Sequence, residues 1–178
     1  MKKIALLLVA MIVSLSAYSE SVSDQMAKIE KLCEKLNKAL EKAPKPCEVA
    51  DIDNYVDGCK TTAVGAVASA VQLQDFYKRQ IGETVDGVTD VTVSKPSLED
   101  WVSLGTTIAT QAAGAAKVGE SAAAAAKALK DVPKMKAISI GKSVKWSGDI
   151  LPVASEALME EGKAVKEIIE TIKSGNNL

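Results

Sequence analysis

Apolar residues recur at intervals of three and four positions through nearly all of the chain after residue 20. This spacing places them along one face of an α-helix, so it predicts a series of amphipathic helices. The expected helices cover residues 21–42, 51–81, 98–131 and 149–174. We therefore predict an all-α fold, a bundle of about four helices that forms a single domain over residues 20–178.

Residues with strong helix-ending and helix-starting preferences support these boundaries. Pro44 and Pro46 end the first helix, because proline has no amide donor and disfavours helical geometry in the residue before it. Asp51 is the expected N-cap of the second helix. Ser97 is the expected N-cap of the third, with Asp100 three residues later in a capping-box arrangement.

Two segments do not follow a clear helical pattern. Between residues 82 and 96 the helical period fails and glycine, threonine and serine accumulate, which predicts an extended loop. Over residues 134–148 the spacing is ambiguous, because Ile138 and Ile140 alternate as in a strand whereas Met135, Ile138 and Lys142 suit a helix. We expect the last helix to begin after this segment, with Pro152 in its first turn.

Charge and composition exclude several functional classes. The chain has 178 residues, with 22 basic against 23 acidic side chains, a formal net charge of −1 and only 3% aromatic residues. This balance leaves no basic surface for nucleic acid. There is no histidine, so no histidine base or metal ligand exists. We expect no catalytic residues, no cofactor and no metal site, and an enzyme is the least favoured reading.

The N-terminus has the pattern of a cleaved export signal. A short basic start is followed by an apolar stretch from residue 4 to residue 15, which is too short to span a bilayer. Ala17 and Ser19 then occupy the −3 and −1 positions of a cleavage site, and a cut after Ala17 is the alternative. We predict a signal peptide over residues 1–19, typical of a bacterial exporter, and a periplasmic or secreted protein.

Three cysteines lie between positions 33 and 59, which in an exported chain predicts a disulfide. If the first two helices form a tight antiparallel hairpin about Pro46, Cys33 faces Cys59, and we predict that this pair is bonded. A Cys33–Cys47 bond stays open as the alternative. Cys47 is then a free or intermolecular thiol, either inert or the point at which two copies join.

Three aspartates between positions 51 and 57 are not in a calcium-loop pattern. The fifth and sixth positions of such a loop are occupied here by Tyr55 and Val56, where an oxygen ligand and a glycine are needed. We assign Asp51 and Asp53 to capping the second helix instead.

Two long uncharged segments, 61–74 and 101–116, are rich in small residues. If their helices are antiparallel, residue numbers that sum to about 179 lie side by side, and the small side chains allow a close approach. The alternative is a hairpin that enters a membrane. Sixteen residues of helix rise only about 24 Å, less than the roughly 30 Å of a hydrocarbon layer.

These features predict an exported, non-catalytic helical-bundle protein that binds a protein partner, forms a homodimer or has a structural role. The alternative is a small membrane-active protein, pore-forming or lipid-binding, that uses segments 61–74 and 101–116. Membrane contact is the less favoured reading, and no nucleic acid is expected. Trp146, Val91 and Val93 are the candidate residues of a binding patch.

Overall fold

The computed structural model describes residues 21–82, 84–85, 88–89 and 94–175. The predicted signal peptide and two residues of the predicted binding patch, Val91 and Val93, lie outside the described residues. Their roles stay predictions.

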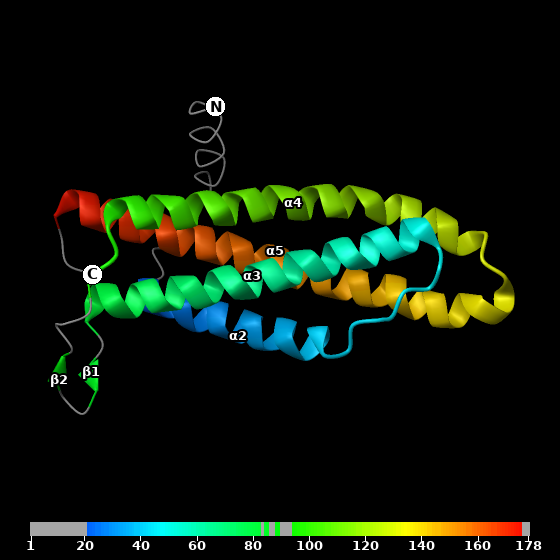
Figure 1. The fold of residues 1–178 in the computed structure, drawn as a ribbon, viewed down its shortest axis with the longest axis horizontal. Coiled ribbons are helices and arrows are strands. Elements are labelled where there is room, and N and C mark those ends of the chain that lie inside the picture. Colours follow the sequence, from blue (N-terminus) through cyan, green and yellow to red (C-terminus); the bar gives the residue numbers. More distant parts are fainter. Residues whose placement is uncertain (1–20, 83, 86–87, 90–93, 176–178) are drawn as a thin grey trace.

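Four helices lie side by side in the described part and form an elongated bundle (Figure 1). They are α2 (Val22–Leu40), α3 (Ala50–Ile81), α4 (Leu98–Lys130) and α5 (Lys134–Ser174). Two short strands, β1 (Thr84–Val85) and β2 (Val88–Thr89), pair antiparallel between α3 and α4. The predicted all-α helical bundle is confirmed.

Helices α3 and α5 contact each other and both of the remaining helices. Helices α2 and α4 are not in contact with each other. Gln25 Nε2 donates to Glu167 Oε2 at 2.8 Å near one end of α2, and Trp146 Nε1 donates to the Ala39 carbonyl at 3.0 Å near the other. These two contacts show that α2 runs antiparallel to α5.

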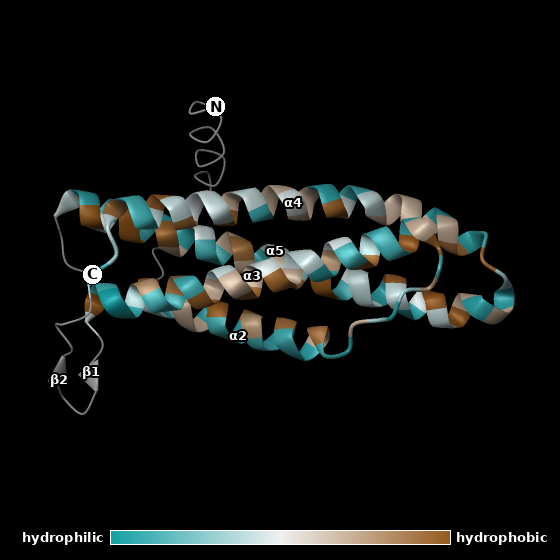
Figure 2. Cartoon of the chain, in the orientation of Figure 1, coloured by the Kyte–Doolittle hydropathy of each residue, from teal (hydrophilic) through white to brown (hydrophobic). Residues whose placement is uncertain are grey.

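The core consists mainly of aliphatic and alanine side chains from all four helices. Figure 2 shows apolar and polar residues alternating along each helix, as expected for helices with one buried face. Trp101 is the largest fully buried side chain and packs edge-on against Phe76, with ring centroids 5.4 Å apart. Its indole N–H points to Gln80 Oε1 at 3.4 Å.

Small residues allow α3 and α4 to approach closely. Ser69 Oγ lies 3.1 Å from Gln111 Oε1, and a Cβ on Gly58 would come within 2.9 Å of Val118. These pairs have residue numbers that sum to 180 and 176, so the predicted antiparallel register of segments 61–74 and 101–116 is confirmed. Among the described residues, no helix is both long and apolar enough to cross a membrane. The membrane-active alternative stays a prediction.

The ends of the first three helices agree with the predicted ones to within two residues. At the start of α4 the Asp100 N–H donates to Ser97 Oγ at 3.2 Å, and the Ser97 N–H donates to Asp100 Oδ2 at 2.8 Å. The predicted capping box is therefore confirmed, and it satisfies amide groups that a helix start leaves free.

The last helix begins much earlier than predicted. The ambiguous segment 134–148 is helical, and α5 starts at Lys134, directly after Pro133. Pro152 therefore lies deep inside α5 and not in its first turn. Pro152 and Gly148 are both exposed, so water can reach the Gly148 carbonyl that lacks its usual amide partner.

The predicted Cys33–Cys59 disulfide is not supported, because all three cysteines are free thiols. Residues 41–49 do not form a tight turn, and Figure 1 shows this connection extending past the end of α2 to a more distant start of α3. Cys33 lies near Glu161, whereas Cys59 lies near Ser147. Those two α5 residues are separated by about 21 Å of helix rise, so the two thiols lie at different heights in the bundle.

Candidate functional site

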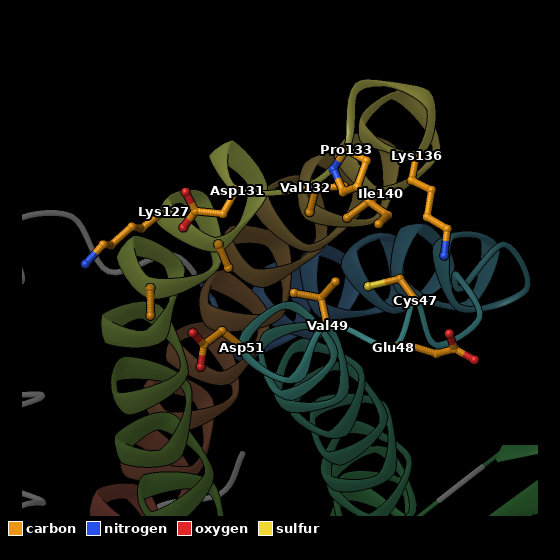
Figure 3. A pocket seen from close by; sticks show the side chains of 12 residues that line it. Cys47, Glu48, Val49, Asp51, Lys127, Asp131, Val132, Pro133, Lys136 and Ile140 are labelled. Atoms are coloured by element: carbon orange, nitrogen blue, oxygen red, sulfur yellow. The ribbon is translucent and has the colours of Figure 1, made fainter.

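Two adjoining grooves lie where α3 begins, α4 ends and α5 begins. The first has a volume of about 660 Å³ and the second about 490 Å³. Figure 3 shows the first groove with Cys47 and Val49 on one side and Pro133 and Ile140 on the other. Residues shared by both grooves are Cys47, Glu48, Lys136 and Ile140. This end of the bundle is therefore concave.

The connection before α3 forms one wall of these grooves, and Asp53 holds it in place. Oδ1 of Asp53 accepts the Cys47 N–H at 2.7 Å and Oδ2 accepts the Glu48 N–H at 2.9 Å. These donors hold the pKa of Asp53 below its usual range. Glu48 adopts a positive φ of 65°, a left-handed backbone conformation that is uncommon for a non-glycine residue.

The helix capping predicted for Asp51 is wrong. α3 begins at Ala50 after Val49, and no side chain caps it. Asp51 is exposed at the margin of the first groove. The capping predicted for Asp53 is wrong as well, because its carboxylate accepts the Cys47 and Glu48 amides of the preceding connection and not an amide of the helix start.

Cys47 is half-buried between the two grooves. Burial and the neighbouring Asp53 carboxylate raise the pKa of its thiol. A reactive cysteine needs a lowered pKa, because the thiolate is the nucleophile. This position therefore favours a contact residue over a catalytic one.

The most exposed apolar side chains of the described residues lie beside the grooves. Met135 is 97% exposed and Ile138 is 75% exposed, on the first turns of α5. They stand three residues apart, so they project from one side of the helix. Folding normally buries such side chains, and paired exposure of this extent is typical of an interaction surface.

Lysines surround these two side chains. Six lysines against one carboxylate, Asp131, lie between residues 127 and 145, in a chain of formal net charge −1. Of the six, only Lys145 takes part in an ion pair with a described residue, to Asp149 at 2.6 Å. The four lysines nearest to Met135 and Ile138 in the sequence are Lys130, Lys134, Lys136 and Lys142. We call these four lysines with Met135 and Ile138 the α5 tip.

A second polar group lies in the middle of the bundle. Glu161 is fully buried, and Ser69 Oγ donates to its Oε2 at 2.5 Å, while Oε1 has no hydrogen-bond partner. Burial raises the pKa of Glu161 to about 8. Sequence reasoning missed this residue, although its position in the apolar series Ala157, Leu158, Ala164, Val165 and Ile168 was a usable signal.

The remaining predicted site residues are spread over the bundle. Burial raises the pKa of both the Cys33 and the Cys59 thiol to about 11. Trp146 is half-buried, and its hydrogen bond to Ala39 joins α5 to α2. The structure does not bring Trp146 into the α5 tip, and no patch that includes Val91 and Val93 can be described.

No set of three or more cysteine, aspartate or glutamate side chains among the described residues is placed to hold a metal ion. Comparison of the chain with protein-family models, with curated proteins and with solved structures finds no match.

Proposed function

We propose that this protein is an exported, non-catalytic helical bundle that acts by binding, and that the end formed by the α4–α5 connection is its contact surface. The observation that carries this proposal is the paired exposure of Met135 and Ile138 beside two grooves. An exposed apolar pair next to a concave surface has the features of a contact site for another molecule.

The position of this surface in the molecule supports the same proposal. The α4–α5 connection is at one extreme of the long axis in Figure 1, so the bundle can make contact there without obstruction from its own helices. Most of the polar side chains around the grooves are charged and solvated, and the thiol between them is not activated. These properties favour recognition over chemistry.

Site-specific photo-crosslinking tests the binding proposal. A photo-reactive amino acid is placed at Met135 and, in a matched control, at Thr106, an exposed residue in the first third of α4. The full chain is expressed in exporting cells and irradiated. We expect adducts, with a protein partner, a second copy or lipid, from position 135 and not from position 106. Equal adduct yields at both positions, or none at 135, would overturn the proposal.

Export is the second part of the proposal and rests on the sequence of residues 1–19. The intact mass of protein purified from the exported fraction tests it. A mass that corresponds to a chain starting at Glu20 is the expected result. A full-length mass, or protein found only inside the cell, would contradict export and a cleaved signal.

A further inference from the structure

The charge around the exposed apolar pair identifies the kind of surface that fits it. We infer that the α5 tip docks on an anionic phospholipid surface, with Met135 and Ile138 entering the headgroup region and the lysines contacting lipid phosphates. This inference rests on the proposed binding function and names the partner.

Charge complementarity is the first argument for this partner. Residues 127–145 carry six lysines against Asp131, and Glu48 and Asp51 add two carboxylates at the same grooves. The whole chain has a formal net charge of −1, so this end is basic relative to the rest of the molecule. An anionic bilayer therefore attracts this end and repels the remainder, which orients the bundle end-on. Lysines near such a surface each add to the binding free energy, and salt screens the attraction.

The arrangement of apolar and basic side chains is the second argument. Lys134 and Lys136 flank Met135 in sequence, and Lys142 lies one turn after Ile138. A lysine can place its methylene groups against apolar surface while its ammonium group stays at the headgroups. Basic residues around a few apolar residues are typical of segments that lie at a membrane surface without spanning it.

A protein partner with an acidic groove is the competing occupant, and it is less favoured because of the shape of the α5 tip. Met135 and Ile138 are 97% and 75% exposed. They belong to the first turns of α5, which lie at an extreme of the long axis (Figure 1). Projecting side chains insert readily into a soft headgroup layer. The grooves beside them give a second copy or a protein a different place to bind.

Vesicle co-sedimentation tests the inference on protein purified from the exported fraction. The probes are vesicles of phosphatidylglycerol and phosphatidylcholine in equal parts, and vesicles of phosphatidylcholine alone. We expect binding to the anionic vesicles at least about 10-fold stronger than to the neutral ones, and a loss of most of that difference at about 0.5 M salt.

Paired variants identify the residues responsible. Lys134→Gln with Lys136→Gln and, separately, Met135→Ser with Ile138→Ser are each expected to weaken anionic-vesicle binding about 10-fold. The matched controls are Lys31→Gln with Lys35→Gln and Val64→Ser with Val71→Ser, which change exposed residues of the same kinds on α2 and α3. The controls are expected to bind as the parent does.

Equal binding to neutral and anionic vesicles, no binding, or equal losses in the control variants would overturn the inference. Failure here is distinguishable from failure of the binding function. If position 135 crosslinks to a protein while vesicles do not bind, the contact surface stands and the lipid partner is wrong. If neither assay gives a signal, both proposals fail.

Discussion

The buried carboxyl group of Glu161 links the stability of the bundle to pH. Its pKa of about 8 in the folded chain lies above the ordinary value of 4.5, so the folded state holds a proton that the unfolded chain releases. The free energy of unfolding therefore falls as the pH rises from about 4.5 to about 8. Below that range the carboxyl is neutral in both states and has no such effect.

Replacement of Glu161 with glutamine tests this pH dependence. The amide stays neutral, so Glu161→Gln is expected to flatten the fall in unfolding free energy between pH 4.5 and pH 8. At pH 9 the variant should exceed the parent in stability by about 1 kcal/mol or more. Urea denaturation at a series of pH values measures both quantities.

The neighbouring Glu160 provides a control of opposite sign. Its carboxylate accepts from Lys28 at 3.0 Å and from Lys163 at 2.9 Å, and these partners hold its pKa below the ordinary value of 4.5 despite its burial. Glu160→Gln is expected to lower stability at neutral pH, an effect that disappears as the pH falls below 4.5. Parallel curves for the two variants would contradict the difference in environment.

The three thiols should differ in reactivity because their burial and surroundings differ. Cys59 is fully buried and Cys33 is half-buried, each with a pKa of about 11, whereas Cys47 is half-buried but lines both grooves. We expect a maleimide at neutral pH to label Cys47 first and Cys59 only when the protein unfolds. Peptide mass mapping over time gives the order. Early labelling of Cys59, or recovery of a Cys33–Cys59 disulfide, would contradict the described packing.

At the scale of the helices, two glycines differ in what surrounds them: one lies where two helices pack closely, and the other faces open space. A Cβ at Gly58 of α3 would lie 2.9 Å from Val118 Cγ2, whereas nothing lies within 4 Å of one at Gly114 of α4. Gly114→Ala is expected to stabilise the protein by about 0.5–1 kcal/mol, since alanine favours the helix. Gly58→Ala is expected to destabilise it by about 1 kcal/mol or more, because overpacking outweighs that gain. Thermal and urea unfolding compare the two, and equal stabilisation would mean that α3 and α4 are not in close contact at Gly58.

The sequence predicted the helix boundaries that depend on apolar spacing and on residues that begin or end helices. The starts of α2, α3 and α4 follow from periodicity and from residues that begin or end helices, such as Ser97. The start of α5 was missed because Ile138 and Ile140 alternate as in a strand. Their burial explains the pattern, since Ile140 is 4% exposed in the core and Ile138 is 75% exposed at the tip of the same helix.

Features set by the relation between elements could not be predicted from local patterns. The Cys33–Cys59 pairing assumed a tight hairpin, but the connection from α2 to α3 runs along the bundle and shifts the register (Figure 1). The α5 tip was missed because the spacing over residues 134–148 is ambiguous between a strand and a helix, so no exposed helical face was assigned to Met135 and Ile138. Only the packed bundle shows that α5 extends beyond the helices that would cover Met135.

At the scale of the whole molecule, the end formed by the α4–α5 connection contains residues that stabilise the fold and residues proposed to contact a partner. Mutations of the two kinds of residue should have different effects. Ile140 is buried against the core, so Ile140→Ala is expected to lower the free energy of unfolding by about 2–4 kcal/mol. Met135→Ser with Ile138→Ser changes only exposed positions and should alter it by less than about 0.5 kcal/mol.

Urea denaturation of both variants measures the difference in their free energies of unfolding. An unchanged midpoint for Met135→Ser with Ile138→Ser, together with weakened binding, would mean that these side chains contribute to contact and not to folding. If this pair destabilises the protein as much as Ile140→Ala does, Met135 and Ile138 belong to the core and the α5 tip is not free to bind.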